Sequence, residues 1–256
     1  MRVANEDRRV YAYVPANRAA RPPLIVVFHG TGANENDGAL DAAVGELGVR
    51  EIADAAGAIV VAPFSVAEAG VNADHDSGGP GWRFGDASSN ADVQLTRALI
   101  QDARKKFTAD ATHVYAVGHS NGAFFTYFAA MKLGDRIAAF AESSGGLIAC
   151  GMRVDCMWAK AGATSCADLM ASAPAGCKCA IGAAPFPTSK FAGRVPQGFL
   201  KHNADDSTVS AAYTCRLGEH LGARAQVAID AQGEHGPTGD FMSRAWTFLA
   251  ARSLAD

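Results

Sequence analysis

The residues 112–122 place a serine between two glycines, in the order Thr-His-Val-Tyr-Ala-Val-Gly-His-Ser-Asn-Gly. Alternating apolar residues predict a short buried strand before the serine, and the residues 123–133 predict a helix directly after it. A serine on a sharp strand-to-helix turn leaves no room for side chains two positions away, which explains Gly118 and Gly122. We therefore interpret Ser120 as a nucleophile, which needs a neighbouring base and donors for the oxyanion formed on its substrate.

The same stretch has two competing interpretations. A G-x-S-x-G pattern can mark only a tight turn, because the chain contains 27 glycines. Ser143 and Ser144 also precede two glycines and are rival nucleophiles, but no helical segment follows them directly. We place both at the end of a strand predicted from the residues 137–141.

A second glycine-containing segment, His29-Gly30-Thr31-Gly32, follows the continuously apolar residues 24–28. Such an apolar run is typical of a parallel strand covered by helices on both faces. Glycines after the strand let the backbone turn its amides outward. We expect the amides of Thr31 and Asn121 to form an oxyanion hole, with an ordinary glycine turn as the alternative.

An acid and a base for Ser120 follow later in the chain. Asp205 and Asp206 come directly after a late strand predicted at 193–202, and either could orient an imidazole. Capping of the next helix is the structural alternative for each of them. His235 lies in a glycine-flanked loop after the last predicted strand, where it is placed to remove the proton of Ser120.

The other six histidines are interpreted as neighbours or surface residues. His29, His119 and His202 lie beside proposed site elements, and His119 is assigned to substrate binding. The remaining three, His75, His113 and His220, are expected at the surface.

A long loop over 64–90 is rich in glycine, serine and aspartate and follows a predicted strand. Ligands bind in such loops of open α/β sheets, so Trp82 is a candidate wall of the substrate cleft, or else a loop residue folded onto the surface. The triplet Asp74-His75-Asp76 could hold a metal, but a short polar cluster is more often a solvated turn. We predict no metal site and no cofactor.

Predicted strands and helices follow one another along most of the chain. The strands are expected at 8–14, 24–28, 58–62, 114–117, 137–141, 193–202 and 226–229. The helices are expected at 39–56, 91–107, 123–133, 211–221 and 241–249. We predict one α/β domain over 1–256. At about 147–192 the alternation of strands and helices is interrupted, and we predict a cap insertion over the cleft there.

The cysteines gather in that insertion. Five of the six lie within thirty residues and one stands apart: Cys150, Cys156, Cys166, Cys177, Cys179 and Cys215. We expect disulfides, hence an oxidising compartment and a secreted or periplasmic protein, although no signal peptide begins this sequence. A zinc site at Cys177-Lys178-Cys179 is the alternative, but its spacing is wrong for a zinc knuckle.

The charge balance excludes several partners. The net charge is −3 and no block of basic residues occurs, which argues against nucleic acid and anionic membranes. No apolar run approaches the length of a membrane span. The expected partner is therefore a substrate, and the oligomeric state stays open.

With nucleophile, acid and base in this order, the chain resembles the α/β-hydrolases. More narrowly, it is similar to the secreted esterases that include polyhydroxybutyrate depolymerases and feruloyl esterases. The resemblance rests on His29-Gly30, on the residues 118–122, and on Asp206-Ser207-Thr208-Val209. It implies the α/β-hydrolase fold, with a mostly parallel central sheet flanked by helices. In that group the acid is usually followed by two residues and a valine, which selects Asp206.

The chain departs from that group in two places. Asn203 stands where the group often has glycine after the histidine that precedes the acid. Gly236-Pro237 after the base keep a proline but lack the usual tryptophan, so an aromatic clamp would have to come from Trp82 or be absent.

Three functions compete at this point. The leading hypothesis is a serine esterase that cleaves small acyl esters, feruloyl esters or a polyester such as polyhydroxybutyrate through an acyl-enzyme. The second is a serine hydrolase of amide bonds in a polymer such as poly(aspartic acid), which would favour a basic track that the sequence lacks. The third is a non-catalytic binding module on the same fold. The presence of candidates for nucleophile, acid and base argues against this third function.

Overall fold

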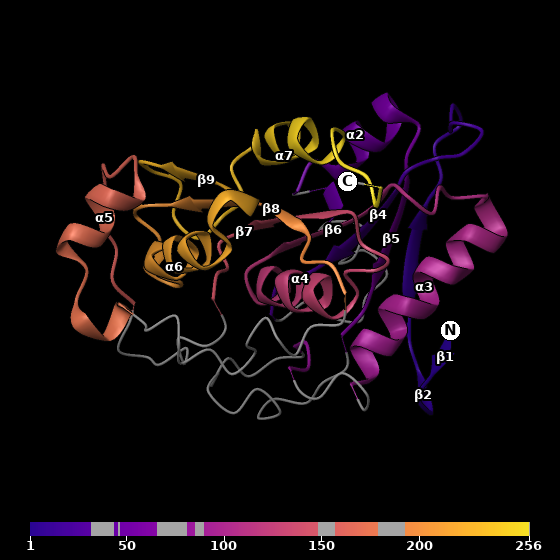
Figure 1. The fold of residues 1–256 in the computed structure, drawn as a ribbon, viewed down its shortest axis with the longest axis horizontal. Coiled ribbons are helices and arrows are strands. Elements are labelled where there is room, and N and C mark those ends of the chain that lie inside the picture. Colours follow the sequence, from indigo (N-terminus) through magenta and orange to yellow (C-terminus); the bar gives the residue numbers. More distant parts are fainter. Residues whose placement is uncertain are drawn as a thin grey trace.

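The protein is described by a computed structural model for the residues 1–31, 44–45, 47–65, 81–84, 90–147, 157–178 and 193–255 (Figure 1). A seven-stranded sheet has the order β3-β5-β4-β6-β7-β8-β9. Its strands are β3 (Val10–Tyr13), β4 (Leu24–Phe28), β5 (Ile59–Pro63), β6 (Val114–His119), β7 (Ala139–Ser143), β8 (Gln197–Asn203) and β9 (Ala225–Asp230). Only β3, at one edge, is antiparallel to its neighbour. Two short strands, β1 (Arg2–Val3) and β2 (Glu6–Asp7), form a separate antiparallel pair.

Helices cover both faces of the sheet (Figure 1). The α-helices are α2 (Val49–Ala56), α3 (Ala91–Phe107), α4 (Asn121–Lys132), α5 (Cys166–Ser172), α6 (Ala211–Leu221) and α7 (Phe241–Leu249). Short 3₁₀ turns occur at η2 (Ala175–Cys177) and η5 (Gly222–Arg224). In Figure 1, α2 and α7 lie on one side of the sheet, and α3, α4 and α6 lie on the other.

The alternation of side chains along β4 explains this three-layer arrangement. Leu24, Val26 and Phe28 pack in one core cluster with residues of α3 and α4. Ile25 and Val27 point to the opposite face and pack with residues of α2 and α7. All five side chains are fully buried, so the strand reads as a continuous apolar run rather than as an alternating one.

The structure confirms most of the predicted elements. Helices at 211–221 and 241–249 have the predicted bounds, and the strand at 24–28 does as well. The strand expected at 193–202 is β8, which ends at Asn203 and includes the buried polar residues Lys201 and His202. Of the helix expected at 39–56, the structure describes α2, and the residues 32–43 and 46 lie outside the described part.

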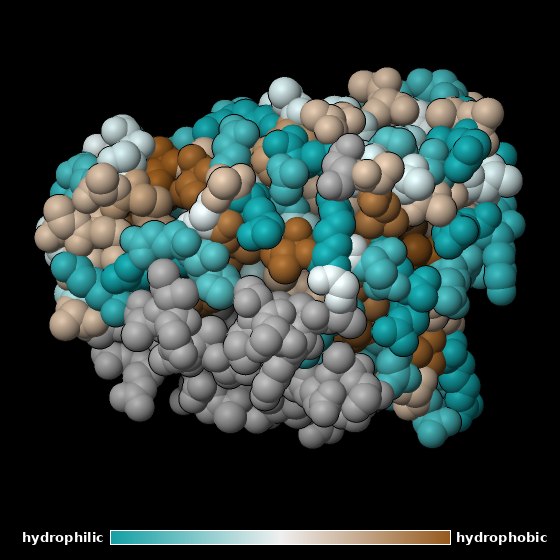
Figure 2. All heavy atoms as spheres, in the orientation of Figure 1, coloured by the Kyte–Doolittle hydropathy of each residue, from teal (hydrophilic) through white to brown (hydrophobic). Residues whose placement is uncertain are grey.

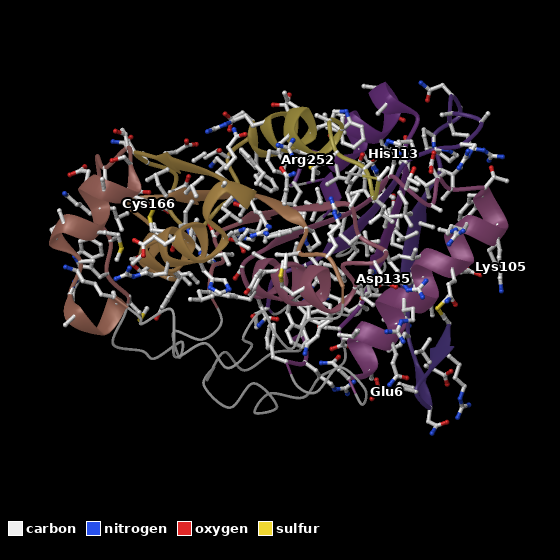
Figure 3. The ribbon with its side chains drawn as sticks, in the orientation of Figure 1. Glu6, Lys105, His113, Asp135, Cys166 and Arg252 are labelled. Carbon is white, nitrogen blue, oxygen red and sulfur yellow. A yellow bond between two sulfur atoms is a disulfide. The ribbon has the colours of Figure 1, made fainter. Side chains whose placement is uncertain are left out.

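The cysteine-rich insertion contains a helix that its sequence pattern did not indicate. This helix, α5, begins at Cys166, and the Ser165 side chain caps it by accepting from the Asp168 amide. It packs against α6, to which the Cys166–Cys215 disulfide joins it (Figure 3). Cys177 is also disulfide-bonded, and no described cysteine is free. Disulfides are thus confirmed for these three, while Cys150, Cys156 and Cys179 lie outside the described residues.

The described half of the insertion also contacts two loops at the carboxyl edge of the sheet. The Lys160 amide donates to the carbonyl oxygen of Ala204, and the Gly162 amide donates to that of Ala231. These loops follow β8 and β9 and lead to Asp206 and His235. The insertion therefore supports the loops with the predicted acid and base; its segments 148–156 and 179–192 lie outside the described residues.

Hydrophilic residues cover most of the described surface in Figure 2, and hydrophobic residues appear there in small, separate groups. Among the described residues the exposed large hydrophobic side chains are Met1 and Met157. None of the described helices combines the length and the apolar character that crossing a bilayer would require.

We expect the Cys166–Cys215 disulfide to contribute strongly to stability, because it closes a chain separation of 49 residues. Replacing both cysteines with alanine should lower the free energy of unfolding by about 2–4 kcal/mol, since the unfolded chain regains its freedom. Urea denaturation of wild type and the double variant measures this loss. An unchanged midpoint would show that packing between α5 and α6 suffices without the bond.

Candidate active site

The turn between β6 and α4 has the geometry predicted for a nucleophile. Ser120 has a positive φ (φ 54°, ψ −125°), a backbone conformation that is unfavourable for a residue with a side chain. A Cβ atom on Gly122 would overlap the carbonyl oxygens of Phe28 and His29, and one on Gly118 would overlap that of Gly122. The two glycines therefore let the first turn of α4 press against the end of β4, with Ser120 at the apex.

Three side chains from separate loops meet at this turn. His235 Nε2 lies 2.9 Å from Ser120 Oγ, and His235 Nδ1 lies 2.8 Å from Asp206 Oδ2. The serine and the histidine are half-buried, whereas the aspartate is fully buried. Because Asp206 accepts the Nδ1 proton, Nε2 of a neutral His235 is free to accept the proton of Ser120.

Asp206 is held as a carboxylate by several donors. Its Oδ1 atom accepts from the backbone amides of Thr208 and Val209 at 2.9 and 2.8 Å. Its Oδ2 atom accepts from His202 Nε2 at 3.1 Å as well as from His235. Burial alone would raise the pKa of Asp206, but the hydrogen bonds from His202 and His235 outweigh burial and hold that pKa well below its usual range.

His202 was expected to be only a neighbour of the site, yet it contacts the acid directly. Its Nε2 atom also lies 2.8 Å from the carbonyl oxygen of Val209, and its Nδ1 atom lies 2.7 Å from Thr214 Oγ1. Since both groups facing Nε2 are acceptors, Nε2 carries a proton. The sequence feature that could have indicated this contact is the position of His202, four residues before Asp206 and close to the end of a buried strand.

Asp205, the alternative acid, points elsewhere. Its carboxylate accepts from the backbone amides of Gly233 and Glu234 at 3.2 and 2.9 Å, so it contacts the loop of His235 rather than the imidazole. Neither aspartate caps the following helix, because Ser210 is the N-cap of α6.

The segment after β4 lies against the serine. A Cβ atom on Gly30 would be 3.2 Å from Ser120 Cβ, which places the neighbouring Thr31 beside the turn. His29 fixes this segment: its Nδ1 donates to the Gly30 carbonyl oxygen at 2.6 Å, and its Nε2 accepts from the Ser65 amide at 3.0 Å. Burial lowers the pKa of His29 to about 4, so the ring is neutral at neutral pH.

Asn121, the residue after the nucleophile, begins α4. The first amides of a helix have no partner within the helix, so the Asn121 amide is available to an oxyanion. The Asn121 side chain is buried and its Oδ1 accepts from the Trp82 amide at 2.9 Å. This contact ties the residues 81–84 to the serine turn.

The structure contradicts the expectation that Trp82 lines a cleft. Its side chain is fully buried and stacks on Phe125 at a centroid distance of 4.9 Å, with Phe28 packed edge-on at 5.1 Å. Its Nε1 donates to the His29 carbonyl oxygen at 2.9 Å. Trp82 thus joins the ends of β4 and α4 from inside the core. The sequence around Trp82 does not predict this burial, because the residues that bury its indole are distant in the chain.

A buried ion pair anchors the same loop. Arg8 Nη1 lies 2.6 Å from Asp92 Oδ1, and both side chains are excluded from solvent. The second oxygen of Asp92 accepts from the Arg83 amide at 2.8 Å, and the Arg8 guanidinium donates twice to the Phe64 carbonyl oxygen. Because each charge has several partners, the pair fixes the residues next to Trp82.

His119 lies between the serine turn and the base. Its ring centroid is 5.1 Å from that of His235, and its Nδ1 donates to the Ser143 carbonyl oxygen at 3.1 Å. Burial, reinforced by the nearby His235, lowers the pKa of His119 to about 4. Ser143 itself is the last residue of β7, as predicted.

Within the described ranges, no three His, Cys, Asp or Glu side chains are grouped as metal ligands would be. The triplet Asp74-His75-Asp76 lies outside these ranges.

The topology and the serine turn together define the α/β-hydrolase fold. Solved structures share this fold. An acetyl xylan esterase from Aspergillus awamori superposes with a TM-score of 0.64 and 17% identity over 95% of this chain and 94% of that one. An S-formylglutathione hydrolase from Agrobacterium tumefaciens superposes with a TM-score of 0.62 and 16% identity, over 98% of this chain and 91% of that one.

Two curated proteins match part of the sequence. A bifunctional acetylxylan esterase/xylanase of Neocallimastix patriciarum is 30% identical over 138 residues, which are 54% of this chain and 18% of that protein. Feruloyl esterase B of Talaromyces stipitatus is 30% identical over 142 residues, 56% of this chain and 37% of that protein. The chain thus spans well under half the length of either relative. No family model matches. The resemblance to esterases inferred from the sequence is confirmed by these matches.

A second carboxyl group lies buried close to the serine turn. Glu142, on β7, pairs in register with Gly118 and is fully buried. Burial raises its pKa to about 8, against smaller opposing effects of the Gly146 amide and the Thr214 hydroxyl. Glu142 is therefore protonated at neutral pH.

We expect Glu142 to make stability fall with rising pH. The unfolded chain releases this proton near the ordinary value of 4.5, whereas the folded protein keeps it up to about pH 8. Between these values the unfolded state binds fewer protons, so the free energy of unfolding falls by up to about 1.4 kcal/mol per pH unit. Glu142→Gln should remove this slope, measured by urea denaturation at several pH values from 5 to 8. Parallel curves for both proteins would contradict the assignment.

Proposed function

We propose that this protein is a serine hydrolase of carboxylic esters with Ser120 as nucleophile, His235 as base and Asp206 as the acid that orients the imidazole. The hydrogen-bonded chain from Ser120 Oγ through His235 to Asp206 carries the proposal. Its two distances, 2.9 and 2.8 Å, suit proton transfer without rearrangement.

The reaction would run through an acyl-enzyme. Ser120 Oγ forms a bond to the ester carbonyl carbon while its proton passes to His235 Nε2. The bond to the alcohol oxygen then breaks, and His235 returns the proton to that oxygen. Water attacks the acyl-enzyme in the same manner, which releases the carboxylic acid and restores the serine.

Donors for the developing negative charge would be the amides of Thr31 and Asn121. The contact of Gly30 with Ser120 and the position of Asn121 at the start of α4 support this assignment. The α4 helix dipole adds to it, because its positive end faces the substrate oxygen. His119, half-buried beside His235, would contact the substrate.

The favoured substrates are acetyl or feruloyl esters, which the names of the matched proteins support. We propose as further substrates small acyl esters and a polyester such as polyhydroxybutyrate, because their ester bonds would be cleaved by the same chemistry. The disulfide between α5 and α6 supports an oxidising compartment, secreted or periplasmic. We also propose that 1–256 forms one domain.

Purified protein should hydrolyse p-nitrophenyl acetate, and Ser120→Ala should lower kcat at least about a thousandfold, because no nucleophile remains. Release of p-nitrophenol measures the rate, and circular dichroism checks the fold of the variant. A folded wild type without ester turnover would favour a binding module instead. A panel of methyl ferulate, acetylated xylan and polyhydroxybutyrate film then ranks the substrates.

The choice of acid has its own test. Asp206→Asn should lower kcat by about 10²–10⁴-fold, since the uncharged amide no longer stabilises the charged imidazole. Asp205→Asn keeps the same size and should cost much less. The reverse ranking would move the role of the acid to Asp205.

A further inference from the structure

The loop that presents His235 has an unusual backbone. Gly233 has φ 141° and Glu234 has φ 51°, a left-handed conformation that side-chain-bearing residues rarely adopt. The loop is exposed at Gly233 and Glu234 and half-buried from His235 onward. An exposed, strained loop moves readily unless other groups hold it, and its position sets the distance from His235 to Ser120.

One buried side chain contacts this loop on both sides of the histidine. Asn203 Nδ2 donates to the carbonyl oxygen of Glu234 at 2.9 Å and to that of Gly236 at 2.8 Å. The Asn203 side chain is 1% exposed, so these bonds are protected from competition by water. A Cβ atom on Gly233 would lie 2.6 Å from Asn203 Nδ2, which explains the glycine there.

The orientation of the Asn203 amide is determined at its other end. Lys201 Nζ donates to Asn203 Oδ1 at 3.0 Å, and the same ammonium pairs with Asp230 at 3.0 Å. Lys201 is fully buried, so its charge needs both partners. An ammonium can only donate and a carbonyl can only accept, so the Asn203 oxygen faces Lys201 and its NH₂ group faces the loop.

Asp205 holds the same loop from its exposed side. Its carboxylate accepts from the amides of Gly233 and Glu234, so the two side chains together make four hydrogen bonds to the backbone around His235. Both residues belong to the short segment 203–206 that also contains the acid Asp206.

We propose that Asn203, with Asp205, is a positioning residue that holds the loop 233–236 so that the His235 imidazole stays between Asp206 and Ser120. The inference rests on the esterase function proposed above. It assigns a role to the residue at which the sequence departs from the glycine of the group it resembles. It also explains why Asp205 stands beside the acid without acting as one.

The test is Asn203→Ala, which removes both donors to the loop and leaves Ser120, Asp206 and His235 unchanged. We expect kcat for p-nitrophenyl acetate to fall by about 10–100-fold, because small misplacements of a base are costly, while KM stays within about twofold. Asp205→Ala should lower kcat less, since its bonds are exposed, and the double variant should lie below either single one.

Arg194→Ala provides the matched control. Its guanidinium also donates to backbone carbonyl oxygens, those of Ile137, Ala138 and Ser253. Ile137 and Ala138 precede β7, at the end of the strand opposite to Ser143, so these bonds lie far from Ser120 along the strands. The Arg194→Ala variant should have a lower free energy of unfolding than wild type and an unchanged kcat. If Asn203→Ala and Arg194→Ala reduce both stability and kcat in parallel, Asn203 is merely structural and the proposal is wrong.

A second readout does not require turnover. The proton between His235 Nδ1 and Asp206 should give a downfield ¹H NMR signal in wild type, assigned by its loss in His235→Ala. In Asn203→Ala this signal should broaden through faster exchange with water, and in Arg194→Ala it should persist. A sharp signal in Asn203→Ala, or unchanged kcat, overturns the proposal. Absence of ester turnover in wild type with the NMR effects intact would instead overturn only the esterase function.

Discussion

The close approach of the first turn of α4 to the end of β4 is the constraint on which the site depends. A Cβ atom on Gly122 would overlap the carbonyl oxygens of Phe28 and His29, and one on Gly118 would overlap that of Gly122, so larger residues would push the helix off the strand. Beside this close approach, Ser120 has a positive φ at the turn. Trp82 fills the space beside the same contact, and the Arg8–Asp92 pair holds the loop of Trp82. Core packing thus supports the strained backbone at Ser120.

The carboxyl end of β8 performs several tasks within a few residues. His202 and Asp206 share a hydrogen bond, which stabilises the carboxylate in a fully buried position. Asn203 and Asp205 make hydrogen bonds to the backbone of the loop that contains His235. Alternate residues at a strand end and in the following turn point in different directions, so one segment can reach both the acid position and the histidine loop. The insertion bonds to Ala204 in the same segment and adds a disulfide-linked support.

The fold itself is shared with solved esterases at 16–17% identity, which is evidence for architecture alone. Function resides in the side chains that the architecture brings together. Here Ser120, His235 and the buried Asp206 form a hydrogen-bonded chain next to the first amides of α4. In folds of this kind the loops at the ends of the strands generally carry the residues that select a ligand, and the strands position those loops.

The sequence by itself determined the apolar strand at 24–28, the helices at 211–221 and 241–249, and the serine turn, because periodicity and glycine spacing are local properties. It also determined the order of serine, acid and histidine. Only the tertiary structure decided that Asp205 bonds to the loop of His235, that His202 contacts Asp206, and that Trp82 belongs to the core. Adjacent residues in a turn have nearly the same sequence context, and what each side chain touches is set by backbone torsions and by segments distant in the chain.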